Sequence, residues 1–183
     1  MIKLLTILLC LFSPLLFAGE CEDITHFQRL LIFNAKDQLM VVKIKNTEFW
    51  VTPGVYSQAN ELNHHNLHVL AADFGLAISP PKLRGVFSLK NKNTDTDSKR
   101  YFYNAQVNGG KIIKPDSIEE IKWLPLNEAM LIITFPHITM LLDQITTYPK
   151  VTWGGTILRY KQGNKLKSTM VKNFFPLTDT QSK

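Results

Sequence analysis

Short apolar runs rich in β-branched residues alternate with polar breaks along much of the chain. A run of this kind, bounded by turn-forming residues, is typical of a β-strand. The pattern predicts strands at residues 29–36, 38–45, 48–52, 84–90, 100–107 and 118–126, and a C-terminal hairpin formed by residues 151–161 and 165–175. Only one or two residues separate the first three strands, so we expect them to form a meander.

Three other segments have apolar residues at the spacing of a helix. The first is residues 61–74, where Asn60 is suited to cap the N-terminus and Gly75 is placed to end the helix. Residues 126–132 and 136–148 are predicted as a short helix and a longer one. Strands mixed with two or three helices predict an α/β domain in which helices pack on a mixed sheet.

The first 18 residues have the layout of a secretory signal peptide. Lys3 gives a basic start, an apolar run follows, and Ala18 is a small residue at the expected cleavage site. The run of about 15 apolar residues is interrupted by Pro14 and is shorter than the roughly 20 that a membrane-spanning helix needs. We therefore expect cleavage and export to the periplasm or the medium, without stable membrane insertion.

The rest of the chain, residues 19–183, is long enough for one domain with a sizeable core. We place that core at about residues 29–147 and treat residues 148–175 as a C-terminal hairpin extension. Cys21 is the single cysteine left after cleavage, so the mature chain cannot form an intramolecular disulfide. It either stays unpaired or pairs between two chains. Glu20, directly before it, argues against lipoprotein processing, which needs a small residue at that position.

The chain carries a formal net charge of +6. Much of the basic excess comes late in the sequence, at Arg159, Lys161, Lys165, Lys167 and Lys172. Such a cluster favours phosphorylated ligands or anionic surfaces through its summed field. The alternative is a solvated face on the two strands of the hairpin. No segment interleaves basic with aromatic residues as a nucleic-acid-binding module does, so we expect no nucleic acid partner.

A loop, a helix and a turn follow one another between Trp50 and Leu76. The loop begins with the sequence WVTPG, the helix ends in DFGL, and the strands at 84–90 and 100–107 and the segment IEEIKWLPLNEA come next. In this order and spacing, from about residue 29 to 147, the elements resemble the Nudix hydrolase family. The resemblance implies a Nudix-like α/β/α sandwich with a mixed β-sheet. It also implies hydrolysis of a nucleoside diphosphate linked to another moiety, with Mg²⁺ or Mn²⁺ as the cofactor and a nucleotide-like or other phosphorylated small molecule as the partner.

The family signature is G-x5-E-x7-R-E-U-x-E-E-x-G-U, where U is a bulky aliphatic residue. Its glycine and aliphatic positions match this segment, but most of its acidic positions do not. Gly54, Gly75 and Leu76 fall on the two glycines and on the last aliphatic position. Asp73 keeps the last acid, and a shifted register brings Glu61 to the first acid position. The first Glu, the Arg and the next two acids of the signature are replaced by Asn60, His68, Val69 and Ala72.

These replacements affect the metal site, because a hard cation such as Mg²⁺ needs several oxygen ligands. The last three acid positions share one face of the helix, so that face offers only the carboxylate of Asp73. Asp73 and Glu61 are the candidate catalytic residues and candidate metal ligands. Glu119 and Glu120 are further candidate ligands, and the alternative for both is an exposed strand entrance. The candidate substrate-binding residues are Gly54, Arg84 and Arg100.

The sequence is compatible with two classes of protein. The chain is either a Nudix-type hydrolase with an impaired or altered metal site, or a catalytically inactive module that uses the fold to bind a ligand or a protein in the periplasm. A weaker hypothesis is a Zn²⁺ or Cu²⁺ site at His64, His65 and His68. Two of these histidines are one helical turn apart, but no third ligand is evident, and the alternative is a solvated histidine patch.

Overall fold

The structure is a computed structural model that describes residues 25–57, 64–94 and 96–178. The signal peptide at 1–18, Cys21, the N-cap Asn60 and the candidate ligand Glu61 lie outside the described residues. None of the helices in the described ranges is long and apolar enough to cross a membrane.

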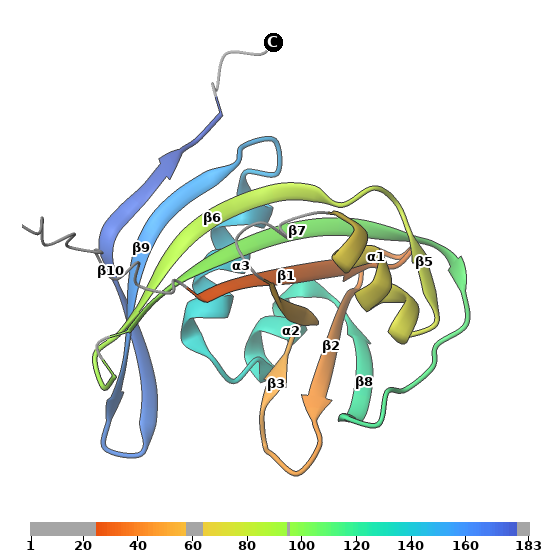
Figure 1. Cartoon of the computed structure of the whole chain (residues 1–183), viewed down its shortest axis with the longest axis horizontal. Coiled ribbons are helices and arrows are strands. Elements are labelled where there is room, and N and C mark those ends of the chain that lie inside the picture. Colours follow the sequence, from red (N-terminus) through yellow and green to blue (C-terminus); the bar gives the residue numbers. More distant parts are fainter. Residues whose placement is uncertain (1–24, 58–63, 95, 179–183) are drawn as a thin grey trace, which may run out of the picture.

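The described part of the chain folds into one mixed sheet with helices on both sides (Figure 1). The elements are β1 (Thr25–Phe33), β2 (Leu39–Ile44), β3 (Trp50–Val51), β4 (Gly54–Ser57), α1 (His64–Asp73), β5 (Leu76–Ile78), β6 (Lys82–Asn91), β7 (Thr96–Gly110), β8 (Ile118–Leu124), α2 (Leu126–Ile132), α3 (Pro136–Thr147), β9 (Trp153–Gln162) and β10 (Lys165–Pro176). The strand order is β10-β9-β6-β7-β1-β2-β3, with β4 on β1, β5 on β7 and β8 on β2. β1 runs parallel to β7 and β6 runs parallel to β9, whereas the other pairs are antiparallel.

The helices cover opposite faces of this sheet. In Figure 1, α1 lies in front of the long strands, and α2 and α3 lie behind them. α3 packs on the sheet through one apolar stripe, because Ile138, Leu141, Leu142 and Ile145 recur at helical spacing and are at most 2% exposed. Pro136 begins this helix, at a position where its missing N–H leaves no hydrogen bond unmade. The predicted α/β/α sandwich with a mixed sheet is confirmed.

The structure adds two short strands, β4 and β5, to the predicted elements. α1 is the described part of the helix predicted at 61–74. β4 starts at Gly54, where the sequence pattern indicated a simple break. A Cβ at this position would lie 2.5 Å from the ring of Phe27, so glycine permits β4 to approach β1 closely.

The C-terminal hairpin is part of the main sheet. It turns at Gly163, whose φ of 59° favours glycine. β9 pairs in parallel with β6 over seven register positions, from Gly85 to Asn91. Ile157 on β9 is fully buried. The hydrophobic core therefore includes residues of the segment that the sequence indicated as an extension.

The sheet divides at β1 into two arms. One arm contains β1, β4, β7, β6, β9 and β10, and the other contains β2, β3 and β8. From His26 to Arg29, β1 pairs with β4. Its other end pairs with β2 at a single register position, Phe33 with Leu39. From there β2 continues with β3 and β8 as its neighbours. Side chains of both arms are thereby brought to face the space between them.

Candidate functional site

A cavity of about 570 Å³ lies between the two arms of the sheet. This volume is within the range typical of small-molecule sites. Side chains from both arms, from α1 and from the start of α3 line it. Most of them are apolar or aromatic. The ionisable ones, apart from Tyr56, are Arg29, Asp73, Arg100, His137 and Arg159.

Arg29 is a buried cation without a carboxylate partner among the described residues. It is 8% exposed, and its Nη1 donates to the carbonyl oxygen of Thr52 at 2.5 Å and to Thr52 Oγ1 at 3.1 Å. None of the ion pairs within the described ranges involves this side chain. Burial, followed by the charge of Arg100, lowers the pKa of Arg29 from its usual range to about 9. The group therefore keeps its positive charge at neutral pH.

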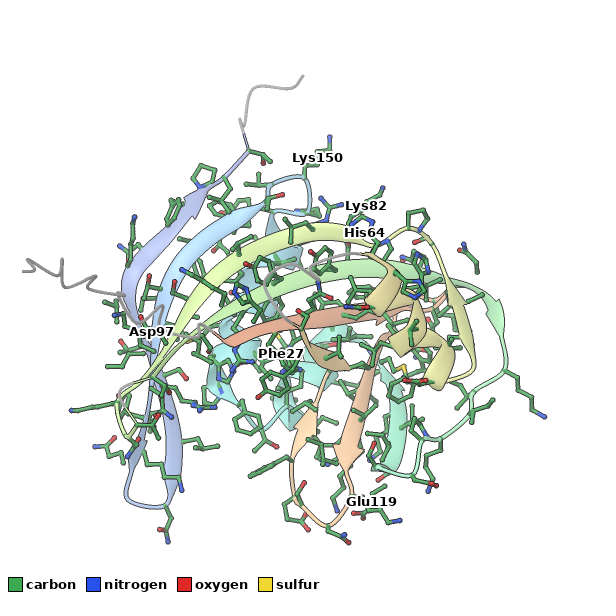
Figure 2. The ribbon with its side chains drawn as sticks, in the orientation of Figure 1. Phe27, His64, Lys82, Asp97, Glu119 and Lys150 are labelled. Atoms are coloured by element: carbon green, nitrogen blue, oxygen red, sulfur yellow. The ribbon has the colours of Figure 1, made fainter. Side chains whose placement is uncertain are left out.

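Arg100 lies beside Arg29 on the neighbouring strand, where the register pairs Phe27 with Arg100. The two guanidinium groups share the ring of Phe27, at 5.0 Å for Arg29 and 4.8 Å for Arg100. Phe27 lies near the middle of the molecule in Figure 2. The Nε of Arg100 is buried and has no hydrogen-bond partner in the described part of the chain. Burial is the main cause that lowers the pKa of Arg100, and the charge of Arg159 adds to it.

His137 brings a neutral imidazole to the same cavity. It is 6% exposed, and its Nδ1 finds no hydrogen-bond partner among the residues that the structure describes. Burial, then the charges of Arg29, Arg159 and Arg100, hold its pKa well below 6.5. At neutral pH the ring is therefore uncharged, and its Nδ1 is a buried polar atom that the described residues leave without a partner.

Asp73 is the one carboxylate among the described residues that line the cavity. It ends α1 and is exposed. Val69 and Ala72, at the other two acid positions of this helix, are also exposed and offer no oxygen ligand. No group of three or more His, Cys, Asp or Glu side chains that could hold a metal ion occurs within residues 25–57, 64–94 and 96–178. The described donor set, one carboxylate with three arginines nearby, does not fit Mg²⁺ or Mn²⁺.

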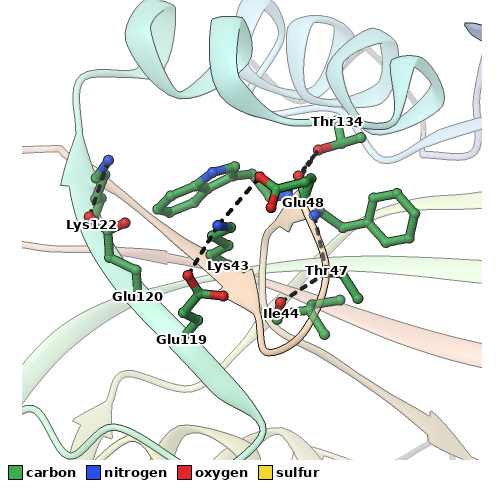
Figure 3. A network of polar contacts seen from close by, with 10 residues as sticks. Lys43, Ile44, Thr47, Glu48, Glu119, Glu120, Lys122 and Thr134 are labelled. Carbon is green, nitrogen blue, oxygen red and sulfur yellow. Dashed lines mark hydrogen bonds and ion pairs between the residues drawn. The ribbon is translucent and has the colours of Figure 1, made fainter.

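Glu119 and Glu120 do not line this cavity. Glu119 pairs with Lys43 at 3.1 Å, and Glu120 pairs with Lys122 at 3.2 Å, both on the surface of β2 and β8 (Figure 3). Lys43 also contacts Glu48 at 3.4 Å. In Figure 2, Glu119 lies well away from Phe27. Both glutamates pair with lysine side chains, and neither lines the cavity together with Asp73.

The other predicted site residues divide between the cavity and its surroundings. Gly54 and Arg100 line the cavity together with Asp73. Arg84 does not, and its Nε donates to Asn104 Oδ1 at 3.2 Å. His64, His65 and His68 are exposed on α1, and the ring of His64 makes an edge contact with Tyr103 at 5.8 Å.

Arg29, His137 and Arg159 belong to this site but were not among the candidate site residues predicted from the sequence. The signal for Arg29 was a charged residue at the start of an apolar strand, in RLLIF. Arg159 was predicted only as one member of a basic cluster that either favours phosphorylated ligands or forms a solvated face, and His137 stands near the start of the helix predicted at 136–148. Their convergence depends on strand pairing far apart in the sequence, namely β1 with β7 and β6 with β9.

Solved structures of Nudix-type proteins share this architecture. A mutator MutT protein from Bacillus halodurans matches with a TM-score of 0.64 at 14% identity, over 81% of this chain and 98% of that chain. A C. elegans Ap4A hydrolase matches with a TM-score of 0.52 at 11% identity, over 69% and 98%. An ADP-ribose pyrophosphatase from Streptococcus suis matches with a TM-score of 0.51 at 13% identity, over 75% and 98%. No family model and no curated protein matches the sequence. Identities this low speak for the fold alone, and the chain has a Nudix-like α/β fold.

Proposed function

We propose that the protein binds a phosphorylated small molecule in the cavity between the two arms, and that arginine side chains hold the phosphate in place of a metal ion. The buried charge of Arg29, which has no described carboxylate partner, carries this proposal. A buried cation without a partner is costly, and an anionic ligand offsets that cost when it binds.

The chemistry of the other side chains supports an oxyanion as the ligand. A guanidinium group donates several N–H groups in one plane and suits the geometry of phosphate oxygens. Arg29, Arg100 and Arg159 line one cavity, and the Nε of Arg100 and the Nδ1 of His137 have no partner among the described residues. The names of the similar structures, such as ADP-ribose pyrophosphatase, agree with a phosphorylated ligand. Because residues 1–18 predict export, we place this binding outside the cytoplasm.

Hydrolysis of a nucleoside diphosphate derivative is the second candidate. The observation in its favour is that Asp73 and Gly54, two positions of the Nudix signature, line the same cavity. In this mechanism Asp73 and Glu61 would hold Mg²⁺ or Mn²⁺, which would neutralise phosphate charge and orient the attacking water. Asp73 alone provides too few oxygen ligands for efficient catalysis, so we rank binding without turnover first.

Two measurements on the purified protein separate these candidates. Thermal unfolding is followed with inorganic phosphate, diphosphate and ADP-ribose, because a ligand at about 100 times its Kd adds roughly 2.7 kcal/mol to the free energy of unfolding. Arg100→Met is expected to lose this stabilisation, whereas Arg84→Met, a control outside the cavity, keeps it. Release of phosphate products is then measured with Mg²⁺ or Mn²⁺, with Asp73→Ala as the comparison. Turnover that depends on Asp73 would favour the hydrolase over the binding protein.

A further inference from the structure

We infer that the natural ligand carries an apolar group on its phosphate, so that the site accepts an anionic amphiphile rather than a nucleotide. This inference rests on the proposed function, because it describes the part of the ligand that the arginines do not hold. It follows from how the lining residues divide between the two arms of the sheet.

The cationic and apolar parts of the cavity come from different arms. Arg29, Arg100 and Arg159 belong to β1, β7 and β9, which lie on one side of the split in the sheet. The other side is formed by β2, β3 and the segment that leads into β8, and the end of α1 adds to the apolar lining. The apolar residues that line this part of the cavity include Val42, Ile44, Val51, Leu70, Phe74, Pro115 and Ile118.

This apolar side offers little to a nucleobase or a sugar. Val42 is 2% exposed and Ile118 is 9% exposed. Among the described lining residues there, the polar side chains are Ser117 and Asp73. A base or a hydroxyl-rich group has several hydrogen-bonding atoms, and each one buried without a partner weakens binding. An alkyl or aryl group has none of these atoms and loses only its contact with water.

Two aromatic rings of the cavity, Phe27 and Tyr56, are in contact with guanidinium groups and with each other. The ring of Phe27 has Arg29 and Arg100 within 5.0 Å of its centre. Tyr56 contacts the same ring edge-on at 4.8 Å and also lies 6.0 Å from the guanidinium of Arg100. A planar base would have to displace a guanidinium group to stack on Phe27. The ring of Phe27 therefore supports the two arginines and is not free for a base to stack on.

If the ligand is amphiphilic, the binding affinity for a series of alkyl phosphates should rise with the length of the alkyl chain. Each methylene that leaves water for an apolar wall strengthens binding about fourfold. Isothermal titration of the purified protein with inorganic phosphate and with ethyl, butyl and hexyl phosphate is expected to show this increment at each added methylene until the chain fills the cavity. Adenosine monophosphate is expected to bind no more tightly than ethyl phosphate.

A matched pair of variants tests whether the chain occupies the apolar side. Val42→Thr keeps the shape of the side chain and adds a hydroxyl to the cavity wall, so it is expected to weaken hexyl phosphate about tenfold and inorganic phosphate little. Val107→Thr makes the same change on β7, outside the cavity, and is expected to alter neither affinity. Thermal unfolding of both variants checks that they are folded.

The outcomes distinguish this inference from the proposed function. If phosphate and all alkyl phosphates fail to bind, the proposed function is wrong and the inference falls with it. If phosphate binds but affinity does not rise with chain length, or adenosine monophosphate binds more tightly than hexyl phosphate, the proposed function stands and the inference is overturned. Equal loss of hexyl phosphate affinity in Val42→Thr and Val107→Thr would also overturn it.

Discussion

Replacement of Arg29 by methionine should make the free protein more stable and should abolish anion binding. Methionine has a similar length and no charge, so it can fill the space of the arginine stem. The two effects have opposite signs because the same buried charge destabilises the empty protein and attracts the ligand. A residue with a purely structural role would not show this combination.

The expected size of the change follows from the surroundings of Arg29. Its pKa is lowered from its usual range to about 9, which corresponds to roughly 5 kcal/mol for keeping the group charged in the folded, empty protein. The variant loses the two hydrogen bonds to Thr52, which costs about 1–3 kcal/mol because that residue is buried. We therefore expect a net gain of about 2 kcal/mol in the free energy of unfolding, after allowance for partial screening of the buried charge by water.

Urea denaturation at neutral pH measures the stability, and calorimetric titration with inorganic phosphate measures the binding. Arg84→Met is the matched control, because Arg84 loses one hydrogen bond to Asn104 and does not line the cavity. It should leave phosphate affinity unchanged. If Arg29→Met lowers the stability by about 2 kcal/mol or more and still binds phosphate, Arg29 is a structural residue and the reasoning is refuted.

Three further predictions concern other parts of the site. Asp73→Asn removes the carboxylate at the cavity and should strengthen phosphate binding severalfold in calorimetry, whereas a metal-dependent site would bind more weakly. As the pH falls below about 6.5, the unfolded state takes up a proton at His137 before the folded state does, so stability should fall by up to about 1.4 kcal/mol per pH unit from this group. Urea melts of His137→Gln should lack that contribution, and melts of the exposed His68→Gln should retain it. The double variant Glu119→Gln and Glu120→Gln should leave phosphate affinity unchanged, and a clear loss would show that these acids reach the site.

Local patterns in the sequence predicted the fold class, and the resemblance to the Nudix family added the sandwich architecture. The spacing from Gly54 to Gly75 fixed a loop, a helix and a turn, and both glycines are required by their surroundings. Gly75 has a φ of 72°, and a Cβ there would lie 2.1 Å from the carbonyl oxygen of Lys111. The apolar stripe of α3 predicted a helix packed on the sheet, which the structure has. These features depend on neighbours a few residues apart, which a sequence pattern can report.

The site was predicted only in part, because its side chains meet through distant pairings. Asp73, Gly54 and Arg100 were found from the family signature and from their charge, and they share one cavity. Glu119 and Glu120 were assigned to the metal site because their carboxylates suit Mg²⁺, but Glu119 pairs with Lys43 across the β2–β8 pair, a contact between distant residues, and Glu120 pairs with Lys122 on its own strand. A lone arginine beside an apolar run is usually solvated. The burial of Arg29 follows from β4 and β7 flanking β1, which sequence reasoning did not predict.

The most direct test of metal-free anion binding is calorimetric titration of the purified protein with inorganic phosphate, once in excess EDTA and once with Mg²⁺. If arginines hold the ligand, saturable binding with one phosphate per chain will appear in EDTA, and its affinity will be unchanged by Mg²⁺. Binding that appears only when Mg²⁺ is present would contradict the account and would show that a metal ion is needed to hold the ligand.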